Sequence, residues 1–483
     1  MNQRRRLLVA ADVGGRHSRH IGDEAMLEAN LEGLRGAVPG AELVVMSRDP
    51  EWIEHRYGVS SVPLFGFASG PAAREERLTL MADLCGAAAS GAAAGDALDA
   101  VRRADAVVVS GGGNLSSTWP HLLGERVTLL LTAHRLGKPA AVLGQTIGPS
   151  LTAEERAMLS EALRAARFVG VRELPSAALA MSLGVPLARL WYQSDDAMFA
   201  PWIGGNAPAV EPDARATIVV TIDPQLRSAC SDGFSALARQ LRELAAITGA
   251  AITLVPHEFG EDAAAGPSDR REARLLASCI ALSEIEIVED LDARSAAFVA
   301  ANAALVISTR YHPLVFALAG GAACVGIYGD EYCRIKLQGA LAHAGLERQA
   351  IRYDDVARGA LLPLALESWR DRERARRDLS ILREKWSEET GRRWEAIGRA
   401  LDPQAPEATI APGAIMGRSG EELVPMLLSA IELGRESVEL LAKRREAAER
   451  TAIAFQTMAR PYLTLRRQAS KLRAVLRRLA ARS

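Results

Sequence analysis

Arg310 and His312 are the two side chains in this sequence best suited by type and spacing to do chemistry. Arg offers a planar fork of donors to a carboxylate or phosphate, and His readily carries a proton near neutral pH. An apolar run at 304–307 precedes them, and Pro313 with the apolar residues 314–318 predicts a helix after them. The pair is therefore predicted at the carboxyl end of a buried strand, where open α/β sheets bind ligands. The alternative is an Arg paired with a carboxylate and a His that caps the helix.

Three consecutive glycines, Gly111, Gly112 and Gly113, follow a second apolar run at 106–110. Glycines let the backbone turn tightly and bring its N–H groups close to a ligand. The stretch lacks the G-x-G-x-x-G spacing of a dinucleotide site and the Lys of a P-loop. A tight turn with no ligand is the alternative.

The elements that must position these residues alternate between strand and helix patterns, at the spacing of parallel βαβ units. A stretch at 201–215, rich in Pro, Gly and Ala, separates two such series, and from about residue 361 the pattern is helical only. We therefore predict an α/β fold with a Rossmann-like domain over residues 1–200, a second over 216–360, and a helical extension over 361–483.

Composition and cysteine usage favour a folded cytoplasmic protein. Apolar residues make up 49% of the chain and charged residues 24%, and the five cysteines form no C-x-x-C pair. We expect a first strand rather than a signal peptide at the start, no membrane span, no disulfide framework and no metal site.

The C-terminal region has its own electrostatic character. Residues 443–483 carry twelve Lys and Arg against two acidic residues, in a chain whose net charge is −1. In a helix predicted over 462–479, the helical wheel from 465 to 479 separates a mostly apolar stripe from a basic face, which is typical of a helix on an anionic membrane. A helix packed on a partner subunit is the alternative, and homo-oligomerisation is left open. The main body does not indicate a nucleic-acid partner.

An ordered set of motifs resembles the polysaccharide pyruvyl transferase family. The motifs recur in family order over roughly residues 7–345: I-G-D-E-A-M at 21–26, V-V-V-S-G-G-G-N-L at 107–115, G-Q-T-I-G-P at 144–149, V-R-E at 171–173, S-D-D at 194–196 and I-S-T-R-Y-H-P-L-V-F-A-L at 307–318. The resemblance implies a GT-B-like arrangement of the two domains, phosphoenolpyruvate as the donor substrate with no further cofactor, and a sugar diol of a polysaccharide, oligosaccharide or lipid-linked glycan as the acceptor.

The resemblance also implies roles for particular residues. Arg172, Arg310 and His312 match the positively charged donor site, and Lys336 with Tyr328 or Tyr332 matches a Tyr and Lys that follow the next strand. Because protonation of the donor at C3 needs an acid, His312 is predicted to supply the proton. We assign further donor contacts to Gly111, Gly112, Gly113, Asn114, Thr146, Ser308 and Tyr311.

The acceptor side is assigned to two pairs of residues. His20 stands where the family usually has Asn, and Asp23 follows it, with an N-cap role for Asp23 as the alternative. His257 and Glu258 follow a predicted strand at 252–255 and are expected to face the same cleft, with solvated loop residues as the alternative.

Two other functions remain open from the sequence. One is a nucleotide-sugar-dependent glycosyltransferase or epimerase on the same fold, and the other is a non-catalytic glycan-binding or scaffold protein. If the amphipathic tail binds a membrane, the enzyme is expected at its inner face.

Overall fold

A computed structural model describes residues 4–15, 18–70, 73–200, 202–203, 216–229, 231–260, 268–282 and 285–405. Contacts divide the chain into the units Met1–Ser429 and Ala430–Ser483, and every described residue lies in the first unit. The helical extension predicted over 361–483 is described only to residue 405, so the amphipathic helix predicted at 462–479 lies outside the described residues, as does most of the stretch at 201–215.

The first half is built on a parallel sheet with strand order β4-β3-β1-β5-β7-β8-β9, in which β6 also pairs with β7. The strands are β1 (Arg6–Ala10), β3 (Glu42–Ser47), β4 (Ser60–Pro63), β5 (Ala106–Val109), β6 (Gly112–Leu115), β7 (Ala140–Ile147), β8 (Phe168–Val171) and β9 (Leu190–Tyr192). Every residue of β5 and β7 is buried, as expected for strands with helices on both faces of the sheet.

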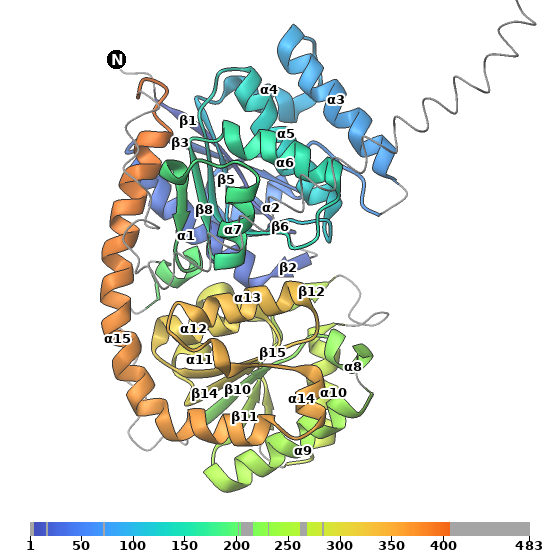
Figure 1. Ribbon diagram of the computed structural model, residues 1–483, viewed down its shortest axis with the longest axis vertical. Helices are drawn as coiled ribbons and strands as arrows, with labels where there is room; N and C mark the ends of the chain where they lie inside the picture. The colour runs from blue at the N-terminus through green and yellow to red at the C-terminus, as the bar shows by residue number, and fades with distance from the viewer. Residues whose placement is uncertain are drawn as a thin grey trace, which may run out of the picture. The chain divides into compact units, whose positions relative to one another are not determined.

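Helices alternate with these strands, as Figure 1 shows. They are α1 (Ile21–Ala37), α2 (Pro50–Tyr57), α3 (Arg74–Ser90), α4 (Gly95–Arg103), α5 (Pro120–Arg135), α6 (Ala153–Ala165), α7 (Leu174–Ser182) and the 3₁₀ turns η2 (Leu187–Arg189) and η3 (Asp196–Phe199). Local signals set several ends: Thr152 and Glu155 form a capping box at α6, and Gly91 ends α3 in the left-handed conformation.

The second half repeats the plan with a parallel sheet of order β13-β11-β10-β14-β15-β16. Its strands are β10 (Thr217–Thr221), β11 (Ala251–Leu254), β13 (Ile285–Ile287), β14 (Leu305–Ser308), β15 (Ala323–Tyr328) and β16 (Ala350–Arg352). Its helices are α8 (Gln225–Ala229), α9 (Ser231–Thr248), α10 (Asp269–Ile280), α11 (Ala293–Ala301), α12 (Tyr311–Gly320), α13 (Glu331–Ala342), α14 (Tyr353–Ala357) and the turn η4 (Glu347–Gln349).

In both sheets the strands are parallel, but the order in which successive strands are added changes side next to the first strand. This change lies between β1 and β5 in the first sheet and between β10 and β14 in the second. This is the strand order of the Rossmann fold, and ligands bind outside the carboxyl ends of the strands at such a point. The predicted α/β fold with two Rossmann-like domains is therefore confirmed.

A short ladder joins the two halves. Strand β2 (Ser18–His20) pairs antiparallel with β12 (Glu258–Gly260), and the N–H of Ile21 donates to the carbonyl of His257 at 3.2 Å. In Figure 1, β2 lies beside β12 between the two sheets.

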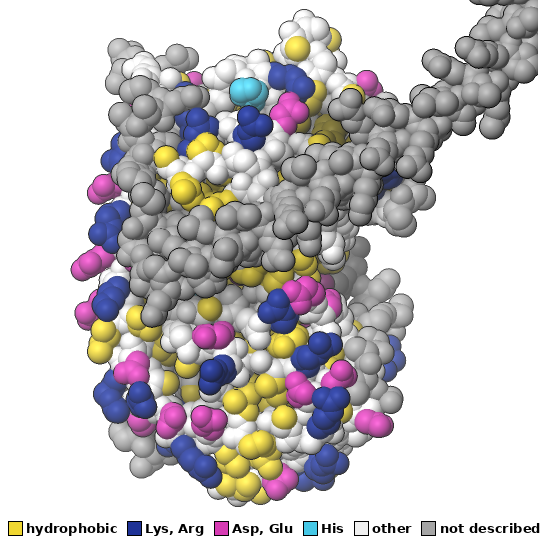
Figure 2. Space-filling view, viewed as in Figure 1, with side chains coloured by type: hydrophobic (Ala, Val, Ile, Leu, Met, Phe, Trp, Pro, Cys, Tyr) yellow, Lys and Arg dark blue, Asp and Glu magenta, His cyan; other side chains and the backbone are white. Residues whose placement is uncertain are grey.

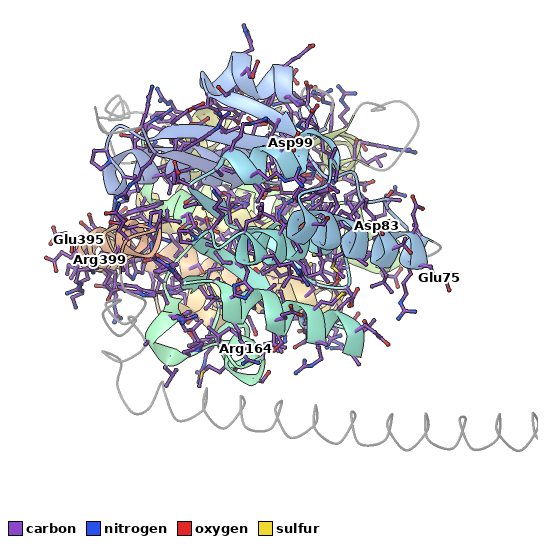
Figure 3. All side chains as sticks on the ribbon, turned by 90° about the horizontal axis from the view of Figure 1, so that it is seen from above. Glu75, Asp83, Asp99, Arg164, Glu395 and Arg399 are labelled. Carbon is purple, nitrogen blue, oxygen red and sulfur yellow. The ribbon has the colours of Figure 1, made fainter. Side chains whose placement is uncertain are left out.

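The 40-residue helix α15 (Leu361–Ala400) contacts both halves, packing on α9 and β15 and on α1. Two of its tryptophans serve as packing anchors: Trp386 is buried, and Trp394 lies on Gly33 of α1. Glu395 and Arg399 of the same helix project outward in Figure 3, as do Glu75 and Asp83 of α3. The helix therefore has a buried stripe and a charged outer face.

The described surface in Figure 2 carries Lys and Arg interspersed with Asp and Glu over the second half, which is typical of a solvated surface. Among the described helices, none alone is long and apolar enough to cross a membrane. Taken together, α3 and α4 meet that length and composition test, with a bend of 43° between them.

Candidate active site

The R-x-H turn connects β14 to α12 and is shaped by Ser308. The Ser308 hydroxyl accepts from the N–H of Arg310 at 2.9 Å and donates to the carbonyl of the same residue at 2.8 Å. Arg310 is the N-cap residue of α12, so His312 lies in the first helical turn. Ser308 therefore acts through the backbone geometry of the turn, and the alternative in which His312 caps the helix is wrong.

Arg310 is committed to two protein carboxylates. Its Nε and Nη2 donate to the two oxygens of Asp269 at 3.1 and 2.6 Å, and Nη2 also pairs with Glu258. Asp269 is fully buried and additionally accepts from the backbone N–H of His257 and of Glu258. The alternative of an Arg paired with a carboxylate thus describes this side chain, and a donor contact by Arg310 stays a prediction.

The imidazole of His312 lies at the junction of the two halves, with its side chain 13% exposed and its Nε2 atom buried. Its ring packs on Gly22 and lies edge-on to Tyr311, and its Nε2 is 3.9 Å from Asp195 Oδ1 and has no hydrogen-bond partner in the part of the chain that the structure describes. Burial, and then the positive charges of Arg172 and Lys336, hold the pKa of His312 well below its usual value. The ring is therefore neutral at neutral pH, with one nitrogen unpaired.

Arg172 follows β8 and lies at the bottom of the site, 1% exposed. Its Nε donates to Thr146 Oγ1 and to Glu173, both at 3.0 Å, and its Nη1 donates to Asp195 at 2.5 Å. The Tyr311 ring lies 4.3 Å from the guanidinium carbon. Thr146 also donates to Glu173 at 2.6 Å, so it belongs to this network.

The glycine loop meets two side chains from α13. Tyr332 donates its hydroxyl hydrogen to the carbonyl of Gly113 at 2.9 Å. A Cβ at position 113 would lie 2.0 Å from the hydroxyl oxygen of Tyr332. Lys336 Nζ lies 4.9 Å from the ring centre of Tyr332 and 5.4 Å from that of Tyr311. Among the described residues Lys336 has no ion pair or hydrogen bond. Tyr328 is instead a core residue, so Tyr332 is the tyrosine at the site.

Asp196 and Asn114 are buried beside the glycine loop. Gly111 and Gly144 lie against the carboxylate of Asp196, which a Cβ at position 144 would approach to 2.6 Å. Asn114 is 4% exposed with its amide beside Gly112. A Cβ at position 144 would collide with this carboxylate, whereas one at position 111 would lie 3.0 Å from Asp196 Oδ2, so packing requires glycine at 144 and favours it at 111. Contacts of Gly112 and Asn114 with a donor stay predictions.

On the acceptor side, His20 and Glu258 face each other across the β2–β12 ladder, with 3.7 Å between His20 Nε2 and Glu258 Oε1. His257 is buried against Phe316, and burial, with the charges of His312 and Arg310, lowers its pKa to about 3. The alternative of solvated loop residues is therefore wrong for His257.

Asp23 occupies the first turn of α1 rather than the N-cap, which is His20 and makes no side-chain cap. The N-cap alternative for Asp23 is therefore wrong. Burial and the neighbouring charge of Asp12 raise the pKa of Asp23 to about 7, against the opposing charges of His20, Lys336 and Arg172. A carboxyl group with this pKa can exchange a proton near neutral pH.

The structure thus brings His312, Arg172, Lys336, Tyr311 and Asp23 to one place, together with Gly113 and His20. It places Ser308, Thr146 and His257 behind them, in hydrogen-bonding or packing roles. Two ion pairs of the site were not predicted from the sequence: Asp195 binds Arg172, and Asp269 binds Arg310. The S-D-D motif was a signal for Asp195, whereas nothing local marks Asp269. The described residues contain no group of three or more His, Cys, Asp or Glu suited to a metal ion.

A family model described as Polysaccharide pyruvyl transferase matches residues 20–191. This match confirms the family resemblance over most of the first half. A comparison with curated proteins finds no match.

Solved structures show the fold at low sequence identity. A candidate UDP-N-acetylglucosamine 2-epimerase from Listeria monocytogenes is 11% identical, with a TM-score of 0.56 over 83% of this chain and 98% of its own. The S. aureus MnaA–UDP complex is also 11% identical, with a TM-score of 0.52 over 83% of this chain and 99% of its own. These similarities confirm the GT-B-like arrangement.

Proposed function

We propose that this chain, whose first half matches the polysaccharide pyruvyl transferase family, transfers pyruvyl from phosphoenolpyruvate to a sugar diol and forms a ketal. The observation that carries the proposal is the pair His312 and Lys336. A buried imidazole nitrogen lies within Coulombic range of an ammonium, and among the described residues the nitrogen has no hydrogen-bond partner and the ammonium no ion pair. Such a pair can hold an anionic donor and pass it a proton.

Lys336 is the side chain best placed to bind the donor directly. Phosphoenolpyruvate carries up to three negative charges, and an ammonium with no ion pair among the described residues can receive a phosphate or carboxylate. The amino terminus of the ten-residue helix α12 adds N–H groups that favour an anion. Arg172 and Arg310 are already bound to carboxylates, so in this proposal they orient neighbours and contribute charge.

His312 supplies the proton that makes the donor electrophilic. Its pKa is lowered in the free protein, and the negative charges of a bound donor act in the opposite direction. The imidazole therefore takes up a proton as the donor binds. It then passes this proton to C3, which leaves an oxocarbenium-like C2.

Asp23 is the base for the acceptor in this proposal. It removes the proton from the first sugar hydroxyl as that oxygen bonds to C2, giving a tetrahedral intermediate that still carries the phosphate. The bond between C2 and the phosphate oxygen then breaks and releases phosphate. The second sugar hydroxyl bonds to C2 and closes the ketal ring. The two sugar hydroxyls lose two protons in total. One replaces the proton that His312 gave to C3, and the other leaves on the phosphate as hydrogen phosphate.

The alternative is a nucleotide-sugar-dependent glycosyltransferase or epimerase. The names of the similar structures, an epimerase and a UDP complex, favour this class, although their likeness concerns the fold alone. A glycan-binding scaffold is the non-enzymatic alternative. The acceptor in either case, including a lipid-linked glycan, is a proposal.

One experiment separates these functions. The protein is incubated with phosphoenolpyruvate and a panel of glycans that present 4,6-diols, and phosphate release is followed together with the mass of the glycan. Phosphate release coupled to the mass gain of one pyruvyl ketal supports the proposal. Binding of a UDP-sugar with no response to phosphoenolpyruvate contradicts it and supports the nucleotide-sugar enzyme. Glycan binding without turnover supports the scaffold.

A further inference from the structure

Arg126 of α5 is a charged side chain for which the structure provides no partner. It is 1% exposed, and its Nε, Nη1 and Nη2 are all buried without a hydrogen-bond partner among the described residues. The adjacent Glu125 is not available, because its carboxylate accepts three backbone N–H groups, from Phe65, Gly66 and Phe67, at 2.8–3.0 Å. A buried guanidinium without acceptors costs several kcal/mol unless an anion or water completes it, by the order of magnitude for buried charges.

His121, on the same helix α5, supplies a second N–H donor. Arg48, just after β3, is 3.1 Å from His121 Nε2 through its Nη2. Because guanidinium can only donate, Nε2 is the acceptor, and the hydrogen of the neutral ring is on Nδ1. This Nδ1 is also buried, and no described residue is within hydrogen-bonding distance of it. Arg126 and His121 therefore present N–H groups that lack an acceptor, with the exposed Arg48 beside them.

This basic cluster, which we define as Arg48, His121 and Arg126, adjoins the acceptor side of the active site. Burial lowers the pKa of Arg126, whereas the charges of Asp12, Glu125 and Asp23 raise it, so Asp12 and Asp23 lie within Coulombic range. Asp12 follows β1 and Arg48 follows β3, at the carboxyl edge of the first sheet. Asp23 is also within Coulombic range of Lys336 and Arg172. Asp23 is therefore within Coulombic range of both Arg126 of the cluster and the cations of the donor site.

We propose that the basic cluster binds a phosphate group of the acceptor, so that the acceptor is a phosphorylated sugar or phosphate-linked glycan. The inference rests on the proposed function and specifies its acceptor. Guanidinium forks match phosphate oxygens, and the Nδ1–H of His121 adds a neutral donor. The carboxylates of Asp12 and Asp23 beside the cluster accept hydrogen bonds from sugar hydroxyls. A phosphorylated sugar supplies both partners at once, which a neutral sugar does not.

The test measures binding in the absence of donor by titration calorimetry on the full chain. The probes are glucose 1-phosphate, methyl α-glucoside, glucuronic acid and inorganic phosphate. We expect glucose 1-phosphate to bind at least about tenfold more tightly than methyl α-glucoside, and Arg126→Met to remove this difference. Equal affinities in the wild-type protein, or an unchanged difference in Arg126→Met, overturn the proposal. Tighter binding of glucuronic acid overturns the assignment to phosphate, and inorganic phosphate binding as tightly as glucose 1-phosphate overturns the assignment to the acceptor.

Lys336→Met distinguishes this site from the donor site. We expect Arg126→Met to weaken glucose 1-phosphate and leave phosphoenolpyruvate unchanged, and Lys336→Met to do the reverse. Loss of glucose 1-phosphate binding in Lys336→Met alone assigns the phosphate to the donor site and overturns the proposal. Because the glucose 1-phosphate arm uses no donor, a failure to bind or consume phosphoenolpyruvate contradicts the proposed function separately.

Arg48→Gln serves if Arg126→Met does not fold, since Arg48 is exposed. It should weaken glucose 1-phosphate several-fold, and an unchanged affinity overturns the proposal. Arg374→Gln, an exposed change on α15, is the matched control for a general loss of positive charge. An equal loss in Arg374→Gln overturns the specific site.

Discussion

Gly22 and His312, 290 positions apart in the sequence, are in direct contact across the two halves of the molecule. A Cβ atom at position 22 would lie 1.7 Å from Nδ1 of His312 and 2.0 Å from its Cγ. Position 22 therefore admits only glycine while the imidazole keeps its place. This contact joins the I-G-D motif of α1 to the R-x-H motif of α12.

The first prediction is that Gly22→Ala displaces the imidazole and lowers kcat by about 100-fold or more, the range for a misplaced acid. Donor affinity should change less, because Lys336 is not touched. Gly36→Ala on the same helix is the control, since a Cβ there meets nothing within 4 Å. Steady-state kinetics with phosphoenolpyruvate measure both. Equal activity in the two variants would show that the contact does not position the acid.

The fold was predictable because buried parallel strands leave long apolar runs and helices leave amphipathic ones. The strand at 305–308 and the turn carrying Arg310 were found this way. The three-residue strands β2 and β12 were not, because such short elements have no period and are held by pairing with each other. Their absence from the prediction left His257 with an open choice between cleft and solvent.

The site was predictable only in part, because ion pairs between distant residues leave no local signal. Arg310 was correctly placed after its strand, but its partner Asp269 is 41 positions away. Arg310 was expected to bind the donor substrate, but its guanidinium is already bound to the carboxylate of Asp269. Among the described cations of the site, Lys336 is seen to lack an ion pair only once the partners of Arg172 and Arg310 are known. Sequence patterns report which groups are present, and the fold decides which are left unpaired.

The second prediction concerns proton uptake by His312. Since its pKa lies well below the usual value in the free protein, it is neutral at pH 7, and donor binding should draw one proton from solution. Calorimetry of phosphoenolpyruvate binding in buffers of different ionisation enthalpy measures this uptake. His312→Gln should abolish it and reduce turnover about 100-fold or more. Wild-type uptake in the Gln variant would assign the proton to another group.

The third prediction is a pH dependence set by Asp23. The pKa of this carboxyl is raised to about 7, so its fraction in the basic form increases as the pH rises through 7. A base must be deprotonated to act, and kcat/KM should therefore fall as the pH drops below about 7. Asp23→Asn should lower turnover at least about 100-fold and remove this limb from the profile. If the limb persists in Asp23→Asn, another group is the base.

The last prediction concerns the ion pair that connects α15 to the floor of the glycine loop. Arg393 is 1% exposed, and its Nη1 pairs with Oδ1 of Asp196, whose Oδ2 lies under Gly144 and has no partner among the described residues. Arg393→Met leaves this carboxylate buried and unpaired, which costs about 3–5 kcal/mol. A cavity of about 360 Å³ borders the pair and gives room for water, so we expect the lower end of that range.

The double variant Arg393→Met with Asp196→Asn removes both charges and should recover most of the lost stability. Denaturant unfolding measures both variants, with Arg374→Met on the exposed face of α15 as control. A loss below about 1 kcal/mol in Arg393→Met, or a double variant less stable than the single one, would contradict a role for this pair in fixing α15 to the first half.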